Sequence, residues 1–206
     1  MKRYLLIAAL TVGLILPAVA PASPAVREIS VDDNFFNPAA PAPSNFATGS
    51  QFHWTRAAGS SGFHNIRQDQ LLFRSGAATT GPIDYTITAS AGSYHYYCEI
   101  HGSPTSGMQG RIKIRPQTSN VTTSSFVVRW ASTATQTGDQ FDVRYRVDGG
   151  TWANWKRDTT GLAATFGANG NPVTVTPGHT YQVEARSEKA ATTNQSDWSP
   201  PATVTT

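Results

Sequence analysis

Cysteine is almost absent from this chain of 206 residues: Cys98 has no second cysteine with which to form a disulfide. The lack is informative because the chain opens with Lys2 and Arg3, an apolar run and Ala18-Val19-Ala20, the pattern of a secretory signal peptide. Small exported domains commonly rely on disulfides. We therefore expect a secreted or periplasmic protein with a signal peptide at 1–20, whose thiol either binds something or is a buried small apolar side chain.

Long hydrophobic runs and an excess of one charge are also missing. Beyond residue 20 no stretch approaches the roughly 18 apolar residues that a spanning helix needs, so no transmembrane segment is expected after cleavage. Sixteen basic residues, two of them in the signal segment, stand against thirteen acidic ones. No Lys/Arg cluster could follow a phosphate backbone, which argues against nucleic acid as a partner.

The signatures of several enzyme classes are absent as well. There is no HExxH, no Gly-Lys phosphate loop, and Gly59–Gly62 is not a nucleophile elbow. The five histidines contain no His-x-His pair of the kind that multicopper oxidases need. Cys98 could act as a nucleophile with His101 as its base, but nothing orients the base or builds an oxyanion hole. We therefore expect a protein that is not an enzyme.

What the chain does contain is a cluster of metal-binding side chains between Tyr94 and Gly110. Cys98, His101 and Met108, the only methionine after the initiator, fall within these seventeen residues. A thiolate, an imidazole and a weak thioether suit copper in an electron-transfer site once a second histidine joins them. His64, which follows a Gly/Ser turn, is the candidate for that ligand.

The spacing predicts how the cluster is brought together. We expect Cys98 to end a strand and His101 to lie in the loop that follows it. The six residues of Gly102–Gly107 are all Gly, Ser, Thr or Pro, so this loop can curl and return Met108 to the metal. Zinc is the alternative, since cysteine and histidine also bind zinc. Zinc has no use for a thioether, however, and no acidic residue is evidently placed beside the set as a general base.

Short alternating segments with Gly/Pro turns and no helical period predict an all-β fold, an antiparallel sandwich, in the N-terminal half. The residues expected on buried faces are Ile29, Val31, Phe52, Trp54, Tyr94, Tyr96 and Cys98. The same alternation turns His53, His95 and Tyr97 outward.

A second all-β sandwich is predicted after a polar boundary at Pro116–Asn120. Clear alternation marks three strands and weaker patterns mark three more: 126–130, 141–147, 181–186, 162–166, 173–175 and 202–205. We therefore divide the mature chain into domains at 21–115 and 116–206.

The N-terminal domain resembles the plastocyanin-like cupredoxins, which are Greek-key β-sandwiches. The matching segments are 31–38, 49–54, His64-Asn65-Ile66, 73–76 and 94–112. The resemblance implies one blue-copper ion bound by His64, Cys98, His101 and Met108, with Asn65 bracing the two ligand loops by hydrogen bonds. The six residues between His101 and Met108 make a longer loop than in plastocyanin itself, and this bears on the copper–sulfur distance.

The C-terminal domain resembles the fibronectin type III domain. The matching features are Trp130, the Pro177–Tyr181 segment and Trp198-Ser199-Pro200. The resemblance implies that Trp130 fills the core and that Tyr181 ties down a corner. Trp152 and Trp155 are expected to pack rather than to bind carbohydrate, although a polysaccharide or cell-surface contact through this domain stays open.

Together these features predict a secreted blue-copper electron-transfer protein, cycling Cu(II)/Cu(I) with a transient redox partner, whose fibronectin-type module positions the copper domain. The alternatives are a copper-binding or copper-buffering protein with no redox partner, and an adhesion module whose cupredoxin domain has become a scaffold.

Overall fold

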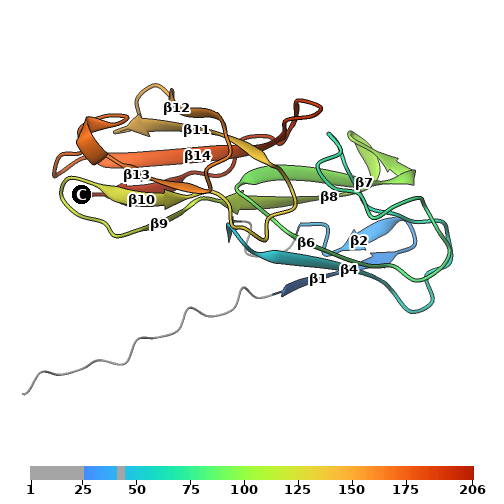
Figure 1. The fold of residues 1–206 in the computed structure, drawn as a ribbon. Helices are drawn as coiled ribbons and strands as arrows, with labels where there is room; N and C mark the ends of the chain where they lie inside the picture. Colours follow the sequence, from blue (N-terminus) through green and yellow to red (C-terminus); the bar gives the residue numbers. More distant parts are fainter. Residues whose placement is uncertain (1–25, 41–44) are drawn as a thin grey trace, which may run out of the picture.

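The computed structural model describes residues 26–40 and 45–206, which form two β-sandwiches (Figure 1). The predicted signal peptide, 1–20, lies outside the described residues. The elements within them are strands and one 3-10 turn at Ala168–Gly170, so the predicted all-β fold is confirmed. No helix among these residues is long and apolar enough to cross a membrane.

The first sandwich consists of two four-stranded sheets, ordered β2-β1-β4-β6 and β3-β8-β7-β5. Its strands are β1 (Val26–Asp32), β2 (Phe35–Asn37), β3 (Phe46–Ala47), β4 (Gln51–Arg56), β5 (Arg67–Gln68), β6 (Asp84–Thr88), β7 (Gly92–Ser103) and β8 (Ser106–Arg115). β1 pairs with β4, and β3 with β8, in parallel. The prediction of a purely antiparallel sandwich is therefore wrong for these pairs, because alternation reports which face of a strand is buried and not the direction of its neighbour.

The core of the first sandwich lies under the predicted ligand strand. Trp54 of β4 is fully buried, and its ring lies 5.3 Å from that of Tyr96 in an edge-on contact. Tyr94, Tyr96 and Cys98 are each 0% exposed, so the predicted inward face of β7 is confirmed. Cys98 therefore packs against a close-packed aromatic core that excludes water.

The opposite face of β7 is buried too, which corrects one expectation. Tyr97 is 7% exposed and is not a surface tyrosine. The edge strand β5 pairs with β7 at this point, and the guanidinium of Arg67 lies 5.3 Å from the centre of the Tyr97 ring. Burial on both faces follows from this cover, which the alternation of β7 alone does not predict.

The second sandwich has a three-stranded sheet, β13-β10-β9, and a larger sheet, β12-β11-β14-β15, with β16 also paired to β14. Its strands are β9 (Gln117–Ser119), β10 (Phe126–Arg129), β11 (Gln140–Val147), β12 (Ala153–Thr159), β13 (Ala163–Phe166), β14 (Thr180–Lys189), β15 (Asn194–Gln195) and β16 (Ala202–Thr205). The strand predicted at 173–175 is not formed, and β12 was not predicted, because its residues are mostly exposed and show no alternation.

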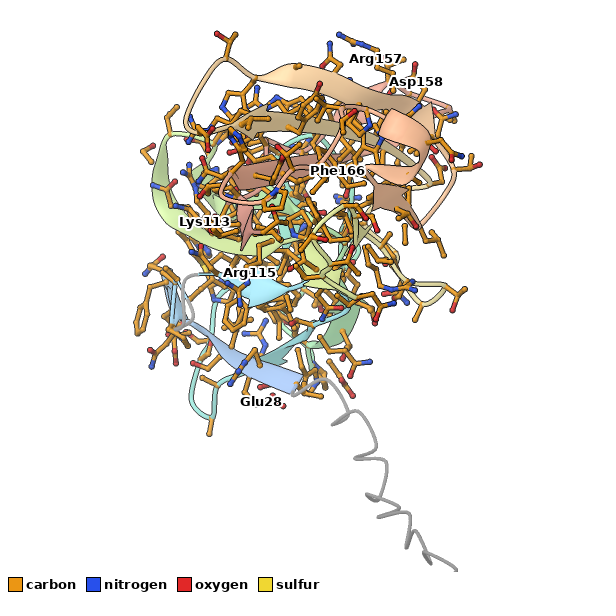
Figure 2. The ribbon with its side chains drawn as sticks, turned by 90° about the vertical axis from the view of Figure 1, so that its left-hand side faces the viewer. Glu28, Lys113, Arg115, Arg157, Asp158 and Phe166 are labelled. Atoms are coloured by element: carbon orange, nitrogen blue, oxygen red, sulfur yellow. The ribbon has the colours of Figure 1, made fainter. Side chains whose placement is uncertain are left out.

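Aromatic side chains fill the second core. Phe166, labelled within the upper sandwich in Figure 2, is fully buried, and the ring of Trp155 contacts it edge-on at 5.1 Å. Tyr181 accepts a hydrogen bond at its hydroxyl from the amide of Thr176 (2.9 Å). Trp152 lies under the guanidinium of Arg144, 4.8 Å from its ring centre. Both tryptophans therefore have packing contacts within the protein.

The two sandwiches are joined through a buried polar junction. Ser93 of β7 and Asp197 exchange two backbone hydrogen bonds (3.0 and 3.1 Å). Ala91 belongs to the apolar core of the second sandwich although it directly precedes β7. Beside it, four fully buried hydroxyls from both sandwiches bond to one another: Ser90, Tyr94, Thr137 and Ser187. Strand β7 thus runs from the second sandwich to the predicted metal ligands (Figure 1).

Candidate metal centre

The ladder between β7 and β8 opens where the predicted ligands lie. Tyr97 pairs with Gln109 and Gly102 pairs with Gly107, so the four residues from Cys98 to His101 lie opposite Met108 alone. In a regular strand, residues three apart point to opposite faces. This bulge removes that constraint and allows Cys98 and His101 to face one centre.

The segment between His101 and Met108 is a hairpin and not an open loop. Gly102 pairs with Gly107 and Ser103 with Ser106, so β7 continues past Cys98 and turns at Pro104-Thr105. The prediction that Cys98 ends its strand is therefore wrong. A side chain at Gly102 would collide with the Met108 carbonyl, and Gly107 has a φ of 77°, so both positions favour glycine. The six residues between His101 and Met108 therefore form this hairpin.

Hydrogen bonds to Thr79 and Arg56 fix the loop that carries His64. Its amide and carbonyl exchange two hydrogen bonds with Thr79, each 3.0 Å long. The guanidinium of Arg56 donates to the carbonyls of Gly62 (3.2 Å) and Gly81 (2.8 Å), which fastens the same loop to its neighbour. The imidazole is completely buried as a result.

The structure brings three of the predicted ligands together. Nδ1 of His64 lies 3.2 Å from Nδ1 of His101, and Sγ of Cys98 lies 3.9 Å and 3.8 Å from these two atoms. The point equidistant from the three atoms is about 2.1 Å from each, close to the usual metal–nitrogen and metal–sulfur lengths of about 2.0–2.3 Å. The donor atoms therefore fit one transition-metal ion without rearrangement.

Met108, the fourth predicted ligand, lies beside this set. It is the one residue of β8 opposite the bulge, and its side chain is 1% exposed within the core cluster that also contains Cys98. Its position follows from the ladder, because the two glycine partners close the hairpin directly beyond it.

Asn65 connects the two segments that carry the ligands. Its side-chain oxygen accepts a hydrogen bond from the amide of Glu99 (2.9 Å), next to Cys98 in β7. Its side-chain nitrogen donates to the carbonyl of Gly76 (2.9 Å) and to the Glu99 carboxylate. Asn65 is 1% exposed, so these bonds are shielded from water and hold His64 and Cys98 at a fixed separation.

An acidic residue that the sequence analysis did not assign lies against the set. Oδ1 of Asp33 is 3.3 Å from Nε2 of His64, the nitrogen that faces away from the other donors. Hydrogen bonds from the Ser61 amide and, to a smaller extent, from the His64 side chain lower the pKa of Asp33. Burial lowers the pKa of His64 below its ordinary 6.5. Asp33 contacts the outer nitrogen of His64 and not the side of the three donor atoms, so it is not placed as the general base that the sequence analysis considered. Asp33 follows a strand directly, but only the turn to Phe35 brings it to His64.

The other three histidines lie elsewhere and are bonded to carboxylates. His95 bonds to Asp69 (3.0 Å), and His179 bonds to Asp148 (2.6 Å) in the second sandwich. His53 bonds to Glu28 and Asp84, both at 2.8 Å.

A second group of ligand-type side chains, Asp142, Asp158 and Glu188, lies in the second sandwich. Asp142 accepts two hydrogen bonds from Arg186 (2.9 and 2.6 Å), and Glu188 accepts one from Gln195 (3.1 Å). Two of the three carboxylates are thus already bonded within the protein.

His53 predicts a pH-dependent contribution to stability. The hydrogen bond to Asp84 raises the pKa of His53 above its ordinary 6.5. Stabilisation by the pair is then complete below about pH 6.5 and is lost as the pH rises through the folded-state pKa. Because both acids are exposed, we expect His53→Gln to cost about 0.5 kcal/mol at about pH 5.5 and little at about pH 9. Urea unfolding checks this; in a Glu28→Gln, Asp84→Asn background, a pH-dependent cost that persists would contradict it.

Comparison with known proteins gives no family for the chain. No family model and no curated protein matches it. A solved structure described as a myokine structure shares 15% identity with a TM-score of 0.32, covering 44% of this chain and 90% of its own. A multi-domain fragment of titin shares 14% identity with a TM-score of 0.34, covering 79% of this chain, which spans 61% of that fragment.

Proposed function

We propose that this protein is an exported electron carrier that holds one copper ion in a site of the blue-copper type, as in the plastocyanin-like cupredoxins. The observation that carries the proposal is the convergence of Cys98 Sγ with the Nδ1 atoms of His64 and His101, 3.2–3.9 Å apart. Two imidazoles and a thiolate in this arrangement are the donor set of electron-transfer copper. Copper bound there would exchange single electrons by alternating between Cu(II) and Cu(I).

Copper is favoured over zinc by the residues around the three donors. Met108 offers a thioether, which suits copper and not zinc. The nearest carboxylate, Asp33, bonds to the outer nitrogen of His64 and not to the donor side, so it is not placed as a general base for a metal-bound water. The arrangement supports a carrier rather than an enzyme.

The protein's own residues keep the geometry fixed and the site dry. Cys98 and His64 are fully buried, and the bulge and the Asn65 bridge hold their segments together. A rigid site changes little between oxidation states, which favours fast electron exchange. His101 is the half-buried ligand, so its outer edge is the proposed exit for electrons.

The surface next to His101 suits a weak and transient redox partner. Phe63 and Ile100 are 56% and 59% exposed and flank His64 and His101 in sequence, and Pro104 at the hairpin tip is exposed. Small apolar contact areas of this kind fit partners that must bind and leave quickly. We propose that the second, fibronectin-type sandwich positions this surface, with a polysaccharide or cell-surface contact as its role.

The test is to add Cu(II) to the purified protein without residues 1–20 and titrate its potential. We expect an intense blue absorption from thiolate-to-copper charge transfer and a reversible one-electron couple. A colourless complex would contradict the proposal. A blue protein that is not reoxidised at a useful rate would instead be a copper buffer. Binding to a surface or glycan that is equally strong with and without copper would indicate an adhesion module.

A further inference from the structure

The turn between β1 and β2 delivers a carboxylate to the back of His64. Asn34 has a φ of 67°, in the left-handed region that asparagine tolerates, so the chain reverses between Asp32 and Phe35. Asp33, the other residue of this turn, is thereby placed over the loop that precedes His64.

The carboxylate of Asp33 is fixed by the loop it contacts. Its oxygens accept hydrogen bonds from the amides of Ser61 (2.8 Å) and Gly62 (3.2 Å) and from the hydroxyls of Ser60 (3.1 Å) and Ser61 (3.2 Å). Nε2 of His64 is the fifth donor, at 3.3 Å. One group therefore holds both the imidazole and the loop that carries it.

This contact selects the tautomer of His64. A neutral imidazole carries one N–H, and an ionised carboxylate only accepts hydrogen bonds, so the proton belongs on Nε2. Nδ1 is then an unprotonated donor facing Cys98 Sγ and His101 Nδ1. Without Asp33 the proton could occupy Nδ1, where it would have to be displaced before a metal binds.

We infer that Asp33 is a positioning residue for His64 that prepares its Nδ1 for copper and lowers the potential of the site; this rests on the proposed function. A carboxylate bonded to a ligand imidazole makes the imidazole a stronger donor, which favours the more highly charged Cu(II). His101 differs, because among the hydrogen bonds of the described residues none involves its Nε2. The two histidines are therefore unequal, with His64 anchored and His101 free at its outer edge.

The test compares Asp33→Ala and Asp33→Asn with Asp32→Asn, which removes the same charge one residue away. Asp32 bonds to Ser30 (2.6 Å) and has no bond to His64. In the metal-free protein, two-bond ¹H–¹⁵N correlation reads the His64 tautomer. We expect Nε2–H in the wild type, in Asp32→Asn and in Asp33→Asn, whose amide oxygen still accepts, and a rise of Nδ1–H in Asp33→Ala.

In the copper-loaded protein, we expect Asp33→Ala to weaken Cu(II) binding roughly 10- to 100-fold. Each tenfold loss that spares Cu(I) raises the potential by about 59 mV, and Asp33→Asn should also raise it through the lost charge. A wild-type tautomer in Asp33→Ala, or an equal potential shift in Asp32→Asn and Asp33→Asn, would overturn the inference. If Asp33→Ala does not fold, the two asparagine variants decide it. A wild-type protein that binds no copper would defeat the proposed function instead, while the tautomer result would still stand.

Discussion

Replacing Cys98 by serine is expected to give a folded protein that no longer turns blue with Cu(II). Sγ is fully buried, so an oxygen in its place fills nearly the same volume, and the Phe63 carbonyl, 3.7 Å from Sγ, can accept its hydrogen bond. The thiolate is the ligand whose charge transfer colours the site, and a hydroxyl does not replace it. Since outer residues alone change metal affinity roughly 10- to 100-fold, we expect loss of this ligand to cost at least about 100-fold.

Visible absorption and copper titration measure both effects, with Met108→Leu as the matched control. Leucine keeps the buried volume of Met108 but offers no sulfur, so the control should stay blue while its potential changes. A blue Cys98→Ser protein would show that the thiol is not the ligand, and a colourless Met108→Leu protein would show that the axial position does more than tune the site.

Replacing Thr137 by valine is expected to destabilise both sandwiches together. The Thr137 hydroxyl accepts from the amide of Ser90 (3.0 Å) and bonds to the hydroxyls of Ser90 (2.6 Å) and Tyr94 (3.1 Å), all within the buried junction. Valine fills the space but leaves the buried Ser90 amide without its acceptor, at about 1–3 kcal/mol, while the hydroxyls of Ser90 and Tyr94 keep their bonds to each other and to Ser187. We therefore expect a loss of about 1–3 kcal/mol in the free energy of unfolding.

Native-state hydrogen exchange tests the coupling. The slowest amides of β4 in the first sandwich and β11 in the second should lose protection by the same amount, because both opening reactions break the junction. Thr165→Val on β13, an exposed threonine, is the control and should change little. Loss of protection confined to β11 would mean that the sandwiches unfold independently and that the junction does not couple them.

Much of the first core could be predicted from the sequence because alternation is a local property. Tyr94, Tyr96 and Cys98 recur at the strand period and share one buried face in the structure. His64, Cys98, His101 and Met108 were chosen for their chemistry and spacing, and the structure brings the donor atoms of the first three within 3.9 Å of one another.

What the sequence could not predict depends on the partner of each strand. Tyr97 is covered by β5, and the bulge at Cys98–His101 exists only relative to the register of β8. The contact of Asp33 with His64 joins residues 31 positions apart through a turn conformation. Such features arise from pairing and register between distant segments, which neither alternation nor motif spacing records.

The hairpin beyond His101 separates the proposed metal ligands from the turn at Pro104-Thr105. Its Gly102–Gly107 and Ser103–Ser106 pairs close the ladder before Pro104-Thr105 is reached. Residues inserted at that tip would therefore lengthen the turn without altering the register that sets Cys98, His101 and Met108. This makes the tip a natural graft point: a short peptide or an electrode linker attached there would sit beside the proposed exit for electrons and leave the donor atoms in place.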